Sequence, residues 1–206
     1  LERPQSEGGP VAYTLDQLWT FEVVDPCHSP ESGKARAAVL VVGLTPDEPF
    51  NIIILHAWAK KTTPNATIEE AYAAHRRFRT IACGIEIVGA QLTYFYWIPT
   101  VYPEMPIRKL KSSTALNAKV RRIREVAPSF GEQGRIYTHP SMSDFHEEWE
   151  SFPSGETVDL LDALSYAPQI WSPPIPDDRG VIRNPADDDD DDDKIILDGR
   201  NQFTGY

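Results

Sequence analysis

Two acidic residues interrupt apolar segments that have the composition of buried strands. Asp25 ends an apolar run that begins at Phe21, and Glu86 lies inside the run at residues 81–88, IACGIEIV. A lone carboxylate in a buried strand is strongly destabilising unless it is paired or binds a metal ion. We therefore expect the fold to bring these acids together at one compensated site.

A third acidic segment is found at residues 151–167, SFPSGETVDLLDALSYA. Phe152-Pro153 ends one helix, and the next helix carries Asp159 in its first turn and Asp162 three residues later on the same face. An acidic first turn also complements the helix dipole, so this helix taken alone has a purely structural explanation. Acids from three distant segments together indicate a metal site.

Length and composition favour one sizeable α/β domain with irregular flanks. The chain has 206 residues, of which 41% are hydrophobic and 18 are prolines. We find no apolar run of membrane-spanning length and no signal-peptide pattern. The start lacks an initiator Met, which we interpret as a domain of a longer polypeptide. The two cysteines, Cys27 and Cys83, are typical of a reducing compartment, and we expect no disulfide between them.

The element order predicts an RNase H-like fold of the α/β class, with a mixed central sheet flanked by helices. An antiparallel hairpin is followed by parallel crossovers in the order βββαβαβα, which makes the first and fourth strands parallel neighbours. Asp25 and Glu86 would then meet near the carboxyl ends of these strands. The predicted strands are 21–25, 38–44, 50–59, 81–88, 107–110 and 134–139, and the predicted helices are 67–79, 91–98, 115–126, 143–152 and 157–167.

Two local signals set predicted helix ends. The capping box Thr67-Ile68-Glu69-Glu70 predicts the start of the first helix, and Pro128 is expected to end the third. Residues 1–20 are predicted to be a linker, 21–167 an RNase H-like domain, and 168–206 a proline-rich and polyacidic tail.

Three acids around bound metal suit the hydrolysis of a phosphodiester. Two divalent ions about 4 Å apart can activate a water and stabilise the leaving oxygen. Oxygen ligands favour Mg²⁺ or Mn²⁺ over zinc, so we expect two Mg²⁺ or Mn²⁺ ions at this site. We interpret His28 as a loop residue. The segment at residues 30–35, PESGKA, lacks the first glycine and the Ser/Thr of a phosphate-binding loop, which argues against an ATPase site.

Charge is distributed unevenly along the chain. The net charge of −11 includes seven adjacent aspartates at residues 187–193, so the remainder carries −4. We expect this acidic run to stay extended and either to compete with DNA for basic residues or to act as a solubilising or docking tail. Residues 107–124 contain seven cations and no acid, which indicates either a DNA-contacting surface or a solvated helix face: Arg108, Lys109, Lys111, Lys119, Arg121, Arg122 and Arg124.

Four segments resemble the C-terminal nuclease domain of tailed-phage terminase large subunits. They are VVDPCHSPESGKARAAVLVVG, GIEIVGAQ, NAKVRRIREVAPSFGEQGRIYTHP and FPSGETVDLLDALSYA, and the resemblance covers about residues 21–167. It implies a metal-dependent endonuclease that cuts concatemeric viral DNA during genome packaging, with double-stranded DNA as substrate. It also implies an N-terminal ATPase domain, a small terminase subunit and a capsid portal as partners, no membrane, and a location in the cytoplasm of a bacteriophage host.

The resemblance assigns roles to individual residues. Asp25 matches the first-strand ligand, Glu86 the fourth-strand acid and Asp159 the last acid before the final helix, so these three are the expected catalytic residues and metal ligands. The family often has two adjacent aspartates where this chain reads Val158-Asp159, which leaves open whether Asp162 is a fourth metal ligand. In the loop after the first strand it also often has a second Asp, where this chain reads Lys34-Ala35-Arg36-Ala37.

Two other functions are compatible with the same residues. An RNase H-like junction resolvase would use the same acids, although such an enzyme is normally a compact dimer without a polyacidic end. A non-catalytic module that docks a packaging motor on the portal would use the tail instead.

Overall fold

The computed structural model describes residues 13–26, 36–46, 49–86, 92–111, 118–131, 133–171, 175–176 and 182–183. The chain divides into a unit at Leu1–Trp171 and a second at Ser172–Tyr206. The described part of the second unit is an antiparallel pair, β7 (Ile175–Pro176) and β8 (Ile182–Arg183). Predictions about His28, Cys27, residues 30–35 and the acidic run at 187–193 fall outside the described residues and stay predictions.

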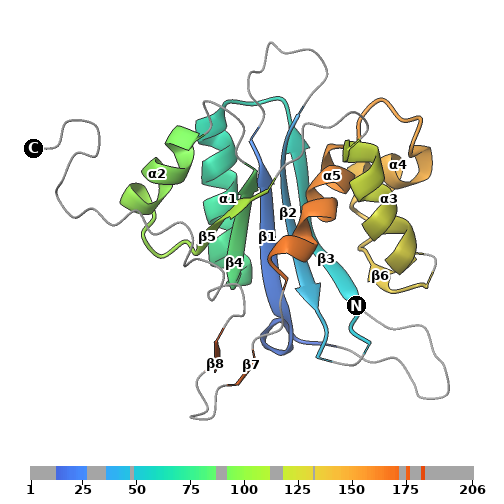
Figure 1. Ribbon diagram of the computed structural model, residues 1–206, viewed down its shortest axis with the longest axis horizontal. Helices are drawn as coiled ribbons and strands as arrows, with labels where there is room; N and C mark the ends of the chain where they lie inside the picture. Colours follow the sequence, from blue (N-terminus) through green and yellow to red (C-terminus); the bar gives the residue numbers. More distant parts are fainter. Residues whose placement is uncertain are drawn as a thin grey trace, which may run out of the picture. The chain divides into compact units, whose positions relative to one another are not determined.

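The described residues of the first unit form a six-stranded mixed sheet in the order β5-β4-β1-β2-β3-β6 (Figure 1). β1, β2 and β3 are antiparallel neighbours, whereas β4 pairs parallel with β1 and β5, and β6 pairs parallel with β3. The predicted mixed sheet, with its hairpin and its parallel first and fourth strands, is therefore confirmed. The strands are β1 Trp19–Asp25, β2 Ala37–Leu44, β3 Ile52–Lys60, β4 Ala82–Glu86, β5 Ile107–Leu110 and β6 Ile136–Tyr137.

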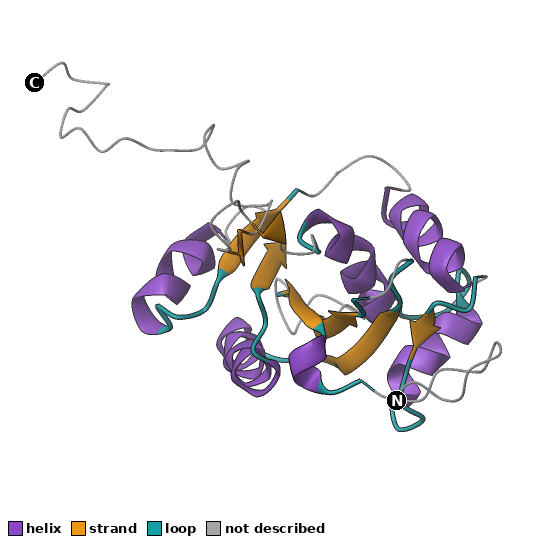
Figure 2. Ribbon diagram, turned by 90° about the horizontal axis from the view of Figure 1, so that it is seen from below, coloured by secondary structure: helices purple, strands orange, loops and turns teal. Residues whose placement is uncertain are grey.

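Helices cover both faces of this sheet (Figure 2). α5 packs on β1, β2 and β3 together with α3 and α4, and α1 packs on the opposite face. Alternate residues of β1 serve these two layers: Phe21 and Val23 join the α5 side, and Val24 joins the α1 side. The helices are α1 Pro64–Phe78, α2 Leu92–Val101, α3 Ala118–Gly131, α4 Ser143–Ser151 and α5 Asp159–Tyr166, with short 3₁₀ turns η1 Leu15–Gln17 and η3 Ala167–Gln169.

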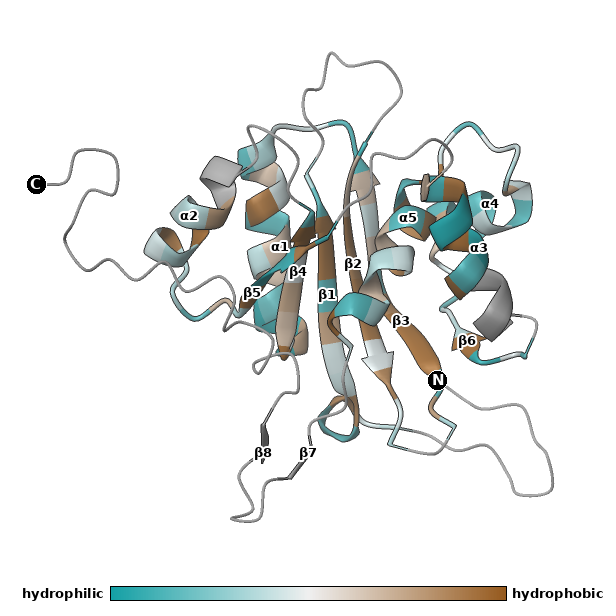
Figure 3. Ribbon diagram, in the orientation of Figure 1, coloured by the Kyte–Doolittle hydropathy of each residue, from teal (hydrophilic) through white to brown (hydrophobic). Residues whose placement is uncertain are grey.

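The hydropathy of the elements follows this layering. All eight residues of β2 are buried, because both faces of the central strand are covered by helices. The sheet strands in Figure 3 are largely brown, and the helices carry most of the teal. None of the described helices combines the length and the apolar character that a membrane crossing requires.

The predicted start of the first helix is wrong. α1 begins at Pro64, and Thr63 is its N-cap, whose side chain accepts a hydrogen bond from the backbone N of Ala66 (3.3 Å). Thr67 lies in the first turn, where its hydroxyl donates to the Thr63 carbonyl (3.1 Å). Proline suits the first helical position because its missing N–H would be unpaired there in any case.

Several other element ends also differ from prediction. Pro128 lies inside α3, which continues to Gly131; a proline removes one helical hydrogen bond, but buried Ile123 and Val126 hold this helix in the core. α2 is longer than predicted, β1 begins at Trp19, and β6 is only two residues long. The first unit runs to Trp171, and Ile170 is buried in the α5-side core.

Candidate metal centre

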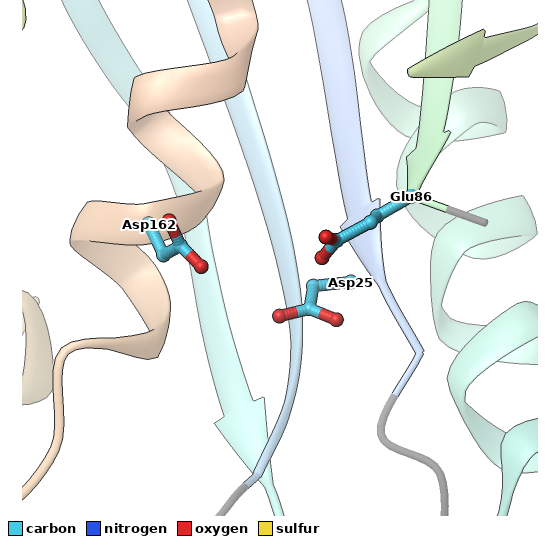
Figure 4. Close-up of side chains that lie close together, drawn as sticks. All are labelled: Asp25, Glu86 and Asp162. Atoms are coloured by element: carbon cyan, nitrogen blue, oxygen red, sulfur yellow. The ribbon is translucent and has the colours of Figure 1, made fainter. Parts of the chain in front are cut away.

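Three carboxylates meet where two central strands end. Asp25 and Glu86 are the last residues of β1 and β4, which pair parallel with Val24 opposite Ile85. Asp162 reaches the same point from α5. One carboxylate oxygen from each of the three lies within 4.8 Å of the others, and Figure 4 shows Asp25 and Glu86 close together with Asp162 across from them. We call these three residues the carboxylate cluster.

The first turn of α5 is held by an acid from another helix. Val158, the residue before α5, has no side-chain acceptor for the free N–H groups of the helix start. Glu148 of α4 takes this role: its Oε2 accepts from the backbone N of Leu160 (2.8 Å) and of Leu161 (3.1 Å). Glu148 is only 1% exposed, so this distant cap belongs to the core and fixes the helix start.

Arg36, just before β2, joins the same helix start to the sheet. Its guanidinium donates to Glu148, to Thr157 Oγ1 (3.1 Å) and to Asp159 Oδ2 (3.3 Å). The predicted ligand Asp159 therefore lies in an ion pair one turn before Asp162. The structure places Asp162 rather than Asp159 in the carboxylate cluster.

Two cations of α3 face the acids of α5. Lys119 Nζ lies 3.2 Å from Asp162 Oδ2 and 3.6 Å from Asp159 Oδ1. Arg122 donates to Asp162 Oδ1 at 2.7 Å and stacks over the Tyr166 ring, with 4.2 Å from its Cζ to the ring centroid. Residues 107–124 contain no acid, but these two cations have acidic partners on α5. Their partners come from a helix about 40 residues away in sequence, which local charge patterning does not show.

The other five cations that were predicted to bind DNA lie in or next to β5 and on α3. Arg108 and Lys109 are in β5, and Lys111 follows it directly, with Leu110 as the register partner of Glu86. Lys109 and Lys111 are exposed, as are Arg121 and Arg124 of α3. Arg121 forms an ion pair with Glu125 one turn along the helix (3.4 Å).

Burial and the repulsion between carboxylates raise the pKa of Asp25 in the carboxylate cluster. Desolvation, followed by the negative charge of Glu86, raises the pKa of Asp25 from 3.8 to about 8, and Lys119 opposes this shift only in part. Within the described part of the chain, no side chain donates a hydrogen bond to Asp25. The cluster thus holds more negative charge than its neighbours balance, which is the environment that a bound cation relieves.

The donor set fits a hard divalent cation. Mg²⁺ and Mn²⁺ prefer carboxylate oxygens, and ligands on opposite sides of such an ion are roughly 4.2 Å apart for bonds of about 2.1 Å. The spread of up to 4.8 Å between the three oxygens is close to that span. Among the described residues, no His or Cys belongs to the cluster, and buried Cys83 lies in the core on the α1 side of the sheet.

Comparison with known proteins gives structural matches only. No family model and no curated protein sequence matches this chain. The nuclease domain of the human cytomegalovirus terminase is similar in structure, with a TM-score of 0.52 and 13% identity over 78% of this chain and 87% of that chain. This similarity concerns the fold of the two chains. The fold is RNase H-like.

Two further solved structures show weaker likeness to this chain. The fowlpox virus Holliday junction resolvase has a TM-score of 0.43 and 12% identity, over 72% of this chain and 94% of its own. T. thermophilus RuvC in complex with a Holliday junction substrate has a TM-score of 0.41 and 14% identity, over 72% and 90%.

Sequence reasoning missed three residues that build this site. Glu148 follows Phe145 by three residues, so an acid on the apolar face of α4 was a readable signal. Tyr166 follows Asp162 by four residues and donates to Glu86 Oε1 at 2.6 Å. Arg36 carries no local signal, because its partners lie more than 100 residues away.

Proposed function

We propose that this protein is a divalent-metal-dependent endonuclease that acts on double-stranded DNA. The observation that carries the proposal is the convergence of Asp25, Glu86 and Asp162 at the carboxyl ends of two parallel central strands. The RNase H-like fold, shared with a viral terminase nuclease domain, supports it.

The residues around the cluster have separable tasks in this proposal. Bound Mg²⁺ or Mn²⁺ would neutralise phosphate charge and lower the pKa of a bound water. Asp25, Glu86 and Asp162 would hold the metal, while Tyr166 orients Glu86 and Arg122 orients Asp162 through the contacts described above. Exposed Lys109 and Lys111 beside the cluster are suited to contacts with the phosphate backbone.

The finer proposal is that the enzyme cuts concatemeric viral DNA during genome packaging. The terminase-like segments of the sequence and the structural likeness to a terminase nuclease domain support this over other nuclease roles. An N-terminal ATPase domain, a small terminase subunit and a capsid portal are the partners that follow from it, and the cytoplasm of a bacteriophage host is the compartment. Asp159 would then act beside the cluster rather than within it.

A nicking assay tests the activity. Supercoiled plasmid is incubated with the protein in Mn²⁺, in Mg²⁺ and in EDTA, beside Asp25→Asn and Glu86→Gln. We expect metal-dependent nicking by the unchanged protein and loss of nicking in both variants. Asp16→Asn is the matched control, because Asp16 is exposed and pairs with Arg79. Nicking that survives Asp25→Asn, or that persists in EDTA, would contradict the proposed centre.

A second substrate separates packaging nuclease from junction resolvase. Linear duplex and an immobile four-way junction are offered at equal concentration, in the same metal. Comparable cutting of both substrates is expected for a packaging endonuclease. Strong preference for the junction, with paired symmetric cuts, would assign the resolvase function instead.

A further inference from the structure

Lys119 occupies the space between two acids of α5. Its ammonium lies 3.2 Å from Asp162 Oδ2 and 3.6 Å from Asp159 Oδ1. A second divalent ion bridging Asp159 and Asp162 would need this position.

The neighbouring cations engage the other oxygens of these acids. Asp162 Oδ1 accepts from Arg122, and Asp159 Oδ2 accepts from Arg36. Both oxygens of each α5 acid are therefore already paired with a cation. By contrast, Asp25 has no cationic partner at ion-pair distance in the described ranges, and Glu86 is bonded by the neutral hydroxyl of Tyr166.

The balance of charges around the centre also favours a single divalent ion. Five carboxylates lie around the centre, namely those of Asp25, Glu86, Asp159, Asp162 and Glu148. Three cations oppose them, namely Arg36, Lys119 and Arg122. Exposed Asp144, which also touches Arg36, is screened by solvent. In ionised form the set carries two excess negative charges, which one divalent ion neutralises and a second would over-compensate.

We propose that Lys119 is a built-in counter-cation that fills the second metal position, so that the protein without nucleic acid binds a single divalent ion between Asp25, Glu86 and Asp162. This proposal rests on the metal centre of the proposed function and revises the expectation of two ions for the nucleic-acid-free state. The side chain of Lys119 is only 39% exposed, whereas that of Arg121 on the same helix is 78% exposed. Among the described cations around the centre, Lys119 contacts both Asp159 and Asp162, whereas Arg36 contacts Asp159 and Arg122 contacts Asp162. This double contact selects Lys119 for the role.

The experiment counts bound Mn²⁺ per chain by equilibrium dialysis in the absence of DNA. We expect one ion for the unchanged protein and two for Lys119→Met, with the first ion bound about tenfold more tightly because a like charge next to the ligands is removed. Arg121→Met, which removes an equal charge from the exposed side of α3, should bind one ion with unchanged affinity. Circular dichroism in EDTA checks that each variant is folded.

The outcomes separate this proposal from the nuclease proposal. The role of Lys119 would be overturned if the unchanged protein bound two ions. It would also be overturned if folded Lys119→Met bound one ion, as the unchanged protein does. Either result would leave the nuclease proposal intact. The count for the unchanged protein applies even if Lys119→Met does not fold. No bound ion in any variant would overturn the metal centre itself. A rise from one bound ion to two in Lys119→Met would support the role of Lys119. If the unchanged protein also failed to cut DNA in the nicking assay, the nuclease proposal alone would be contradicted.

Discussion

The hydroxyl of Tyr166 lies 2.6 Å from Glu86 Oε1 and donates a hydrogen bond to it. The ring of the same tyrosine lies under the guanidinium of Arg122, which in turn binds Asp162. One aromatic side chain on α5 therefore connects the acid of β4 with the acid of its own helix. We infer that Tyr166 determines how the oxygens of the cluster are oriented.

Replacing Tyr166 by phenylalanine tests this connection. Tyr166→Phe keeps the ring beneath Arg122 but removes the donor to Glu86, so Glu86 is free to rotate. We expect metal affinity and nicking to fall about 10–100-fold, as for other residues that orient a ligand. Calorimetric titration with Mn²⁺ and the plasmid assay measure the two effects.

Tyr72→Phe is the matched control for this change. Tyr72 also donates to a carboxylate, that of Glu104, but on the exposed side of α1. It should leave metal affinity unchanged. Equal effects of the two variants would show that Tyr166 has no orienting role.

The cap that Glu148 provides for α5 predicts a loss of stability. Glu148→Gln leaves one acceptor for the N–H groups of Leu160 and Leu161 and removes the charge opposite Arg36. We expect the free energy of unfolding to fall by about 1–3 kcal/mol, measured by urea denaturation. Glu147→Gln, on the exposed neighbouring residue, should change it by less than about 0.5 kcal/mol. Equal stability of the two variants would argue against the cap.

Buried Glu22 predicts a pH dependence of stability on the other face of the sheet. Its carboxyl is fully buried, and Oε2 accepts from Thr80 Oγ1 at 3.3 Å. Burial raises its pKa well above 4.5. The folded protein then keeps a proton that the unfolded chain loses, so stability present at low pH is lost as pH rises through the folded pKa. Glu22→Gln should match the unchanged protein at pH 4 and melt at a higher temperature at pH 9.

The raised pKa of Asp25 also predicts a loss of stability as pH rises, which bound metal should remove. Since this pKa moves from 3.8 to about 8 on folding, the free energy of unfolding of the metal-free protein should fall as pH rises between these values. Saturating Mn²⁺ should remove the fall, which it cannot do for Glu22. In EDTA at pH 9, Asp25→Asn should melt at a higher temperature than the unchanged protein. A lower melting temperature would mean that Asp25 is not under electrostatic strain.

The exposed cations beside Glu86 predict the salt dependence of DNA binding. Lys109→Ala combined with Lys111→Ala removes two charges, so the slope of log affinity against log salt concentration should become shallower by about 2 for any duplex sequence. Fluorescence anisotropy at several salt concentrations measures the slope. Arg76→Ala with Arg77→Ala, near the C-terminal end of α1, is the matched double control. Equal slopes in both pairs would remove β5 from the DNA-binding surface.

The sheet could be read from local patterns to a large extent. The apolar runs at residues 38–44 and 50–59 predict the hairpin, and the helix between the third and fourth strands predicts the parallel return of β4 beside β1. Element ends were less predictable, as Thr63 and Pro128 show. Propensity and capping signals act over a few residues, and packing of Ile123 and Val126 outweighs the cost of one proline.

The sequence by itself determined that Asp25 and Glu86 would lie near the carboxyl ends of neighbouring parallel strands, because hydrophobic periodicity and connection order are local properties of the chain. Only the tertiary structure decided that Asp162 joins them while Asp159 pairs with Arg36. It also decided that Lys119 and Arg122 face these acids rather than solvent. The physical reason is that the rotation of α5 about its axis depends on the burial of Leu160, Leu161 and Leu164 and on the cap from Glu148. These are contacts with other elements of the fold, which the local pattern of α5 does not encode.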